Sequence, residues 1–250
     1  MSKNFVLEIS NLFVSLNDKK IINDFNLNIL PGEVHVIMGP NGVGKSTLAR
    51  FLAGDYVNYS FSGSVLFNGV DLFKLAKNEI SLNGMFLSFQ NPIDIPGVSN
   101  LDFFKSFLNY RRKINGIEPL DNIAFLNEVK TYMLSLSMDE KLLNRYLNVD
   151  FSGGEKKKNE VLQMLLLKPR LSVLDEIDSG LDVDSLKNVF KSINKFKNKT
   201  SSFLIITHYT RILEYMDIDF IHVMCDGKIV KTGKTELLND INSNGYFQFT

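Results

Sequence analysis

The chain has 250 residues, 44% of them hydrophobic, which is enough for one large domain or two small ones with a packed core. Lysine and arginine together number 28, as do aspartate and glutamate, and this zero formal net charge gives no reason to expect nucleic acid as a partner. No apolar run approaches the ~20 residues that span a bilayer, so we expect no direct insertion into a membrane.

The N-terminal part is expected to be rich in β-strands and to carry no targeting signal. Met1–Phe5 shows neither a signal peptide nor an Arg/Ser-rich transit peptide. We therefore expect a bacterial cytoplasmic protein, with the plastid stroma after removal of a transit peptide as the alternative. Strand-like runs follow at Phe5–Ile9, Ile21–Ile29 and Ser64–Phe67.

A complete phosphate-binding loop, called the phosphate loop below, occupies Gly39–Thr47 and matches the pattern G-x-x-x-x-G-K-[ST]. An apolar run at 33–38 predicts a strand before it, and 46–52 predicts a helix after it, which is the context that the loop requires. A chance match in a glycine-rich turn would lack this context. Backbone N–H groups, a lysine and a hydroxyl would then hold a nucleoside triphosphate and Mg²⁺. The expected nucleotide-binding residues are Gly39, Pro40, Asn41, Gly42, Val43, Gly44, Lys45, Ser46 and Thr47, with Ser46 also on the metal.

The middle of the chain combines a strand end with a mostly helical stretch. Gln90 follows the strand-like run Met85–Phe89, where it could ligate Mg²⁺ and sense the γ-phosphate. Taken alone, an exposed loop residue is the simpler interpretation of Gln90. Apolar residues then recur at helical spacing between about Ser99 and Asn148, and these stripes are expected to face a core.

Ser152-Gly153-Gly154-Glu155 precedes a helix-like run at Lys156–Leu167. The pattern Ser-x-x-Glu is a capping box, which explains these residues without any ligand. Two glycines before a helix also leave N–H groups open to a phosphate. Both interpretations can hold at once.

An apolar strand at Leu171–Leu174 ends in two carboxylates, Asp175 and Glu176. Adjacent residues diverge at a strand end, so Asp175 can reach Mg²⁺ while Glu176 faces an attacking water. Hydrolysis of a triphosphate needs both an oxygen ligand for the cation and a carboxylate that polarises water. An ordinary acidic turn is the alternative when this segment is taken alone.

The C-terminal part again alternates helices and strands, which favours an α/β fold. We expect helices at Asp184–Phe196 and Thr210–Met216 and strands at Phe203–Thr207 and Phe220–Met224. His208 follows a strand and could bind the γ-phosphate, although a single histidine there is more often structural. His35 and His222 lie within strands and are assigned a structural role.

The single cysteine, Cys225, excludes a disulfide framework or a cysteine-based metal site within one chain. It lies in a strand-like run and is expected to be buried and inert. An iron–sulfur cluster usually needs about four thiolates, so this chain alone cannot hold one.

In this order the motifs resemble the nucleotide-binding domain of the ABC ATPase superfamily, over nearly the whole chain. The resemblance makes Gln90 the Q-loop, Ser152–Glu155 the signature segment, and His208 the switch histidine. It implies a single α/β domain with a P-loop, RecA-like core (1–90 and 160–250), an N-terminal antiparallel β part and a helical subdomain at about 91–159. It also implies that ATP and Mg²⁺ are bound. Catalytic roles are then implied for Glu176, His208 and Gln90, and the metal ligands would be Ser46, Gln90 and Asp175. Further nucleotide contacts would come from Ser152, Gly153, Gly154 and Glu155.

Several segments are similar to the SufC branch of that superfamily, the ATPases of SUF iron–sulfur cluster assembly. They are Phe89–Pro92 with Ile95–Asn100, Phe151–Lys157, and Asp175–Asp182 with Thr207–Tyr209. Phe-Ser-Gly-Gly-Glu stands where transporters usually carry Leu-Ser-Gly-Gly-Gln. The resemblance implies ATP hydrolysis that drives conformational change in SufB-like and SufD-like scaffold partners. The rival interpretations are an ATPase subunit of a membrane transporter, and a regulator that binds nucleotide without hydrolysing it.

The family also implies a transient, ATP-dependent head-to-tail homodimer, in which the signature segment of one copy meets the γ-phosphate at Lys45 of the other. Two positions depart from the family pattern. Lys158 stands where relatives often have arginine, and lysine lacks the planar fork of the guanidinium group. Leu16 stands where relatives often stack an aromatic side chain on adenine, so base selectivity stays open.

Overall fold

The computed structural model of the protein describes residues 4–249, in two compact units. Residues 1–3, part of the segment on which the targeting expectation rests, lie outside the described residues. The first unit consists of the chain up to Leu87, 169–177 and the part from Lys197 onward, and the second consists of 88–168 and 178–196. Within the described residues, no helix is both long and apolar enough to cross a bilayer.

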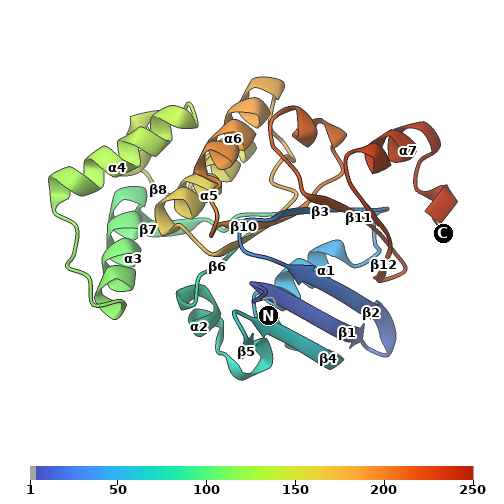
Figure 1. Ribbon diagram of the computed structural model, residues 1–250. Coiled ribbons are helices and arrows are strands. Elements are labelled where there is room, and N and C mark those ends of the chain that lie inside the picture. Colours follow the sequence, from blue (N-terminus) through green and yellow to red (C-terminus); the bar gives the residue numbers. More distant parts are fainter. Residues whose placement is uncertain (1–3, 250) are drawn as a thin grey trace. The chain divides into compact units, whose positions relative to one another are not determined.

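The first unit contains two sheets (Figure 1). An antiparallel sheet has the strand order β2-β1-β4-β5, and a larger sheet has the order β12-β11-β3-β10-β9-β6. The strands of the first sheet are β1 (Leu7–Leu16), β2 (Lys19–Ile29), β4 (Tyr59–Phe67) and β5 (Val70–Asp71). Those of the second are β3 (Val34–Met38), β6 (Met85–Ser88), β9 (Leu171–Asp175), β10 (Ser202–Ile206), β11 (Phe220–Cys225) and β12 (Lys228–Gly233).

The central strands of the larger sheet are parallel and fully buried. Strand β10 pairs in parallel with both β3 and β9, and β11 pairs in parallel with β3. All five residues of β3, β9 and β10 are buried, which explains why these segments read as continuous apolar runs rather than as alternating patterns. The α/β expectation is therefore confirmed for this unit.

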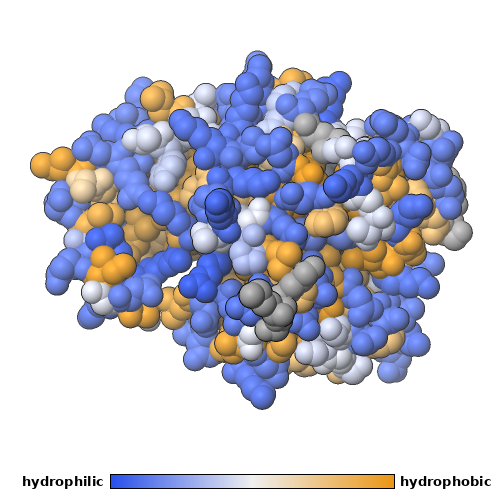
Figure 2. All heavy atoms as spheres, in the orientation of Figure 1, coloured by the Kyte–Doolittle hydropathy of each residue, from blue (hydrophilic) through white to orange (hydrophobic). Residues whose placement is uncertain are grey.

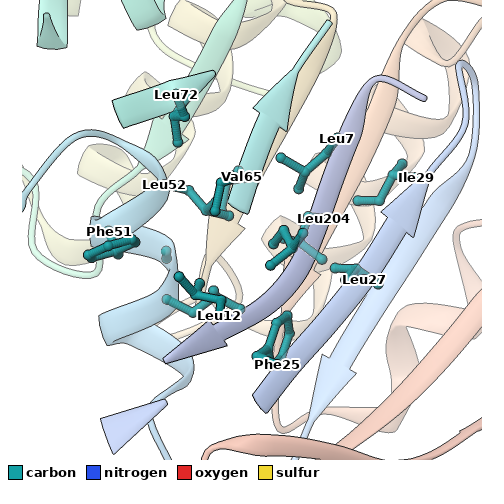
Figure 3. Packing of buried hydrophobic residues seen from close by; sticks show 14 of the residues in the cluster. Leu7, Leu12, Phe25, Leu27, Ile29, Phe51, Leu52, Val65, Leu72 and Leu204 are labelled. Atoms are coloured by element: carbon teal, nitrogen blue, oxygen red, sulfur yellow. The ribbon is translucent and has the colours of Figure 1, made fainter. Parts of the chain in front are cut away.

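One apolar core joins the two sheets to helix α1 (Lys45–Leu52). Figure 3 shows Leu52 of α1 beside Val65 of β4, and Leu204 of β10 among side chains of β1 and β2. Buried side chains alternate along β1 and β2, as expected for sheets with one buried face, with one break in each strand, between Ile9 and Leu12 and between Ile22 and Phe25. The phosphate loop is thus anchored at both ends, by β3 before it and by α1 after it.

The second unit is mainly helical. Its Ser99 side chain accepts the Asp102 N–H and so caps α3, and Asp121 caps α4 in the same way. The expected helical middle is confirmed, together with a short two-stranded sheet that the sequence did not suggest. The elements are β7 (Ile95–Ser99), α3 (Asn100–Ile114), α4 (Asn122–Ser135), the 3₁₀ helix Glu140–Asn144, β8 (Tyr146–Leu147), α5 (Gly153–Leu167) and α6 (Val183–Phe196).

Some elements differ from the sequence-based expectations. The helix expected at Thr210–Met216 is only a 3₁₀ turn, Thr210–Glu214, without a side-chain cap at its start. The remaining elements of the first unit were not predicted, because they are short or only half-buried: strands β5 and β12, α2 (Lys77–Leu82), the 3₁₀ turns Leu72–Lys74 and Phe247–Phe249, and α7 (Glu236–Asn244).

The two strand histidines form a buried hydrogen-bond chain, which confirms their structural role. His35 Nε2 lies 3.0 Å from the Glu33 carboxylate, His35 Nδ1 lies 2.9 Å from His222 Nε2, and His222 Nδ1 lies 2.9 Å from Thr232 Oγ1. Because a carboxylate only accepts, His35 carries its proton on Nε2 and His222 donates to it. Burial lowers the pKa of His35, and it lowers the pKa of His222 to about 3.

This histidine pair predicts acid-sensitive stability. Between the ordinary histidine pKa of 6.5 and about 3, the unfolded chain binds a proton at His222 that the folded chain does not. Stability therefore falls as pH drops below about 6.5, by up to ~1.4 kcal/mol per pH unit for one proton. We expect His222→Gln, which cannot be protonated, to show a shallower decline than the wild type in urea unfolding at pH 7, 6 and 5. Parallel declines would contradict this account.

Candidate active site

The predicted catalytic residues of the first unit follow three neighbouring parallel strands. Ile206 of β10 is in register with Ile37 of β3 and with Asp175 of β9, so the three strands end at one edge of the sheet. Ligands of open α/β sheets bind outside such carboxyl ends. The segments that follow β3, β9 and β10 contain the phosphate loop, Glu176 and His208, respectively.

The phosphate loop adopts a backbone that only glycine fits at several positions. Gly42 and Gly44 have φ of 80° and 106°. A Cβ at Gly39 would lie 2.1 Å from the Met224 carbonyl oxygen, and one at Gly44 would lie 2.8 Å from that of Ile21. Helix α1 begins after Gly44 with no side-chain cap, so its first N–H groups suit an anion such as a phosphate.

Lys45 is held inside the loop with its ammonium group on backbone carbonyls. Lys45 is only 5% exposed, and its Nζ donates to Gly39 O and Pro40 O, each at 2.8 Å. Burial lowers the Lys45 pKa, while the nearby Glu176 and Asp175 carboxylates oppose that shift. An ammonium group that donates to neutral carbonyls keeps its positive charge uncompensated at these contacts, which suits it to receive phosphate oxygens.

Ser46 and Asp175 meet at the start of α1 and the end of β9. The Ser46 hydroxyl donates to Asp175 Oδ1 at 3.2 Å, and Asp175 is 3% exposed. A hydroxyl beside a carboxylate is a set of hard oxygen donors, which suits Mg²⁺ when phosphate oxygens supply further ligands. These residues therefore fit the expected metal, and no larger cluster of metal-ligating side chains was found among the described residues.

Glu176 and His208 form a hydrogen-bonded pair next to this site. His208 Nε2 lies 3.0 Å from Glu176 Oε1. The backbone of Glu176 is left-handed, with φ of 48°, and its N–H donates to Ile206 O at 2.9 Å. Such a conformation costs free energy in a non-glycine residue and is often found at functional sites. The turn after β10, which carries His208, is stabilised by a hydrogen bond from the Tyr209 N–H to Thr207 Oγ1.

The other expected site residues belong to the second unit, so the first unit does not bring them together with Lys45. Gln90 is exposed just after β6. Ser152 and Glu155 form the predicted capping box, with the Ser152 N–H donating to Glu155 Oε2 at 2.7 Å and the Glu155 N–H to Ser152 Oγ at 3.2 Å. A Cβ at Gly153 would meet no atom within 4 Å, so the start of α5 is open to an approaching group.

Sequence reasoning missed Tyr246, which reaches the phosphate loop from the C-terminal segment. Burial raises the pKa of Tyr246, and the nearby Gly39 backbone opposes that rise. A tyrosine after a short amphipathic helix gives no signal of this contact. Cys225, by contrast, is buried as expected, with a pKa raised by burial, which suits an inert thiol.

Sequence comparisons place this geometry among ATP-binding proteins. The family model described as ABC transporter matches residues 22–179. "Probable ATP-dependent transporter ycf16" of Trieres chinensis is 46% identical over 98% of this chain and 98% of its own length. "Probable ATP-dependent transporter SufC" of Escherichia coli (strain K12) is 46% identical over 96% of this chain and 97% of its own.

Solved structures confirm the expected fold. The ATP-binding cassette MJ0796, a dimer in a post-hydrolysis state with ADP and Pi, superposes with a TM-score of 0.77 at 18% identity, over 92% of this chain and 98% of that one. A nucleotide-free ATP-binding cassette from an ABC transporter gives 0.74 at 24% identity, over 96% of each chain. At such identities the likeness concerns the fold alone.

Proposed function

The chain belongs to the ABC transporter family, as an ATP-hydrolysing ATPase of the SufC/ycf16 type, and from this premise we propose that its ATPase cycle drives conformational change in a SufB/SufD-like scaffold during iron–sulfur cluster assembly. The 46% identity to a protein named SufC, over nearly both lengths, carries this proposal. We place the protein in the cytoplasm on the same basis.

The geometry of the first unit supports the proposed roles of its residues, and the resemblance to the ABC ATPases supports that of Gln90. Lys45 and the phosphate loop amides bind the phosphates of ATP, and Ser46 and Asp175 would hold Mg²⁺. The family resemblance alone adds Gln90 as a further ligand. The metal, when bound, neutralises charge on the phosphate oxygens. Glu176 accepts a hydrogen bond from the attacking water and polarises it, while His208, at 3.0 Å from Glu176, orients that carboxylate and the γ-phosphate.

We propose that the active form is a head-to-tail dimer that closes on ATP. Cassette MJ0796 is described as dimeric in its post-hydrolysis state. The open space at Gly153, at the start of α5, supports a phosphate contact from a second copy. Ser152, Gly153, Gly154 and Glu155 of one chain would then complete the site at Lys45 of the other.

Exposed apolar side chains on the second unit support a protein partner. They lie on the β7–β8 sheet and on the segment before it, and we call them the β7–β8 surface: Phe89, Ile93, Ile95, Val98 and Tyr146. Ile93 is 70% exposed and Tyr146 51%. Figure 2 shows one face of the molecule covered mainly by hydrophilic residues, which makes exposed apolar groups of this kind informative.

Co-purification tests the partner. Tagged wild-type protein, isolated under native conditions, is expected to retain soluble SufB-like and SufD-like proteins. We expect Ile93→Asp to reduce their recovery by ~10-fold or more, because a charge is then desolvated at the interface, with unchanged ATP binding. Ile123→Asp, at a 74% exposed residue of α4 that is not part of the β7–β8 surface, is the matched control. Recovery of a membrane permease instead would favour the transporter alternative.

A further inference from the structure

Helix α5 carries two buried charged residues that the ATPase mechanism above does not use. Lys157 and Glu160 are each 4% exposed, and Lys157 Nζ lies 3.8 Å from Glu160 Oε2. Charged residues are rarely buried to this degree without a specific partner. Their positions fall one to two turns after the signature segment, on the same helix.

Both residues bind the backbone immediately before Gln90. Glu160 Oε1 accepts the Phe89 N–H at 2.9 Å, and Lys157 Nζ donates to the Phe89 carbonyl at 2.8 Å. Glu160 Oε2 also accepts the Ser88 hydroxyl at 2.9 Å. The side chain of Phe89 is 47% exposed, so packing alone does not fix this residue. Its backbone is held instead by the two charged side chains of α5.

The far end of the Gln90 loop is tied to the same helix. Asn159, fully buried, donates to Asn148 Oδ1 at 2.9 Å, and Asn148 donates to the Ile93 carbonyl at 2.8 Å. The segment between Phe89 and Ile93 is therefore bound to α5 at both ends. Gln90 lies inside this segment.

We propose that Lys157 and Glu160 are positioning residues for ATP hydrolysis, which hold the Gln90 loop to the helix that begins at the signature segment so that the two move as one body. This inference rests on the proposed role of Gln90. Stability alone does not account for the pair, because buried ion pairs are often no more stabilising than apolar residues of the same volume.

The protonation of Glu160 supplies an independent readout. Burial raises its pKa to about 7, against the opposing effect of Lys157 and of hydrogen bonds from Phe89 and Ser88. Between pH 4.5 and 7, Glu160 is therefore protonated in the folded chain and ionised in the unfolded chain. Because the folded state binds the extra proton, the free energy of unfolding falls as pH rises through this range. A neutral glutamine at this position is therefore expected to leave the melting temperature at pH 8 unchanged or higher.

The test measures steady-state ATPase activity, ATP affinity and thermal unfolding of the full chain with Mg²⁺, from pH 6 to 8. We expect Glu160→Gln and Lys157→Met each to lower kcat about fivefold or more at pH 8 with ATP affinity within about twofold of wild type. The wild-type kcat is expected to rise with pH around 7, and Glu160→Gln is expected to flatten that rise. Glu128→Gln, which breaks the exposed Glu128–Lys168 ion pair of the same unit, is the matched control with wild-type activity.

The outcomes separate this inference from the role of Gln90. Gln90→Ala is measured alongside, and its kcat is expected to fall. If Gln90→Ala lowers kcat while Glu160→Gln and Lys157→Met do not, the positioning role is wrong and the role of Gln90 stands. If Gln90→Ala has no effect, both are wrong. A kcat loss in Glu160→Gln that only tracks a lower melting temperature would also overturn the inference.

Discussion

Lys45→Ala is expected to weaken ATP binding by ~10–100-fold while leaving the fold intact. The ammonium group is the only hydrogen-bonding part of this side chain, and it is held at 2.8 Å from two loop carbonyls where phosphate oxygens would arrive. Charge-assisted hydrogen bonds of this kind contribute ~1.5–3 kcal/mol each. The variant no longer has to desolvate an ammonium group on folding, and this gain offsets part of the free energy of folding that is lost with the two hydrogen bonds.

The measurement is titration of a fluorescent ATP analogue in the presence of Mg²⁺, with circular dichroism as the check on folding. Lys77→Ala is the matched control, because Lys77 makes an exposed ion pair with Asp55 at 3.4 Å elsewhere in the same unit. Its affinity should equal that of the wild type, since exposed ion pairs contribute little. A folded Lys45→Ala protein with wild-type affinity would remove Lys45 from the nucleotide site.

The parts of the fold that were predictable are those where local chemistry is restrictive. The phosphate loop could be predicted because a side chain at Gly39 or Gly44 would clash with nearby backbone atoms, so these positions require glycine. Strands β3, β9 and β10 were found because both of their faces are buried. The capping box at Ser152 was found because its hydrogen bonds are local in sequence.

What the sequence left open depends on contacts between distant segments. Tyr246 and Gly39 are 207 positions apart, and no pattern within either segment predicts that the two are neighbours. Lys157 and Glu160 lie within a helix that was predicted, but charged residues on a helix are usually exposed. Their burial becomes visible only when Phe89 is placed beside them.

The Glu176–His208 pair also needed the structure. Thirty-two positions separate the two residues, and only the parallel pairing of β9 with β10 brings their loops to one edge. The pair restricts the chemistry of Glu176, because a carboxylate held by the imidazole at 3.0 Å is fixed in orientation before ATP arrives. This arrangement favours Glu176 as the group that polarises water over an ordinary acidic turn.

Glu176→Gln is therefore expected to bind ATP with near wild-type affinity and to hydrolyse it ~100–10,000-fold more slowly. The amide keeps the shape of the carboxylate and still accepts a hydrogen bond from His208, but it is too weak a base to polarise water, and loss of a positioned base typically costs a factor of that size. Phosphate release with Mg²⁺ measures the rate, and the fluorescent analogue measures affinity.

The same variant is expected to reveal the dimer, because ATP that is bound and not hydrolysed keeps the two copies closed. Size-exclusion chromatography with saturating ATP should show Glu176→Gln as a dimer, and without nucleotide as the wild type. The double variant with Lys45→Ala is the control, since it should no longer bind ATP and should lose the shift. A Glu176→Gln protein that stays monomeric at saturating ATP would contradict closure, and one that hydrolyses at the wild-type rate would assign water polarisation to another residue.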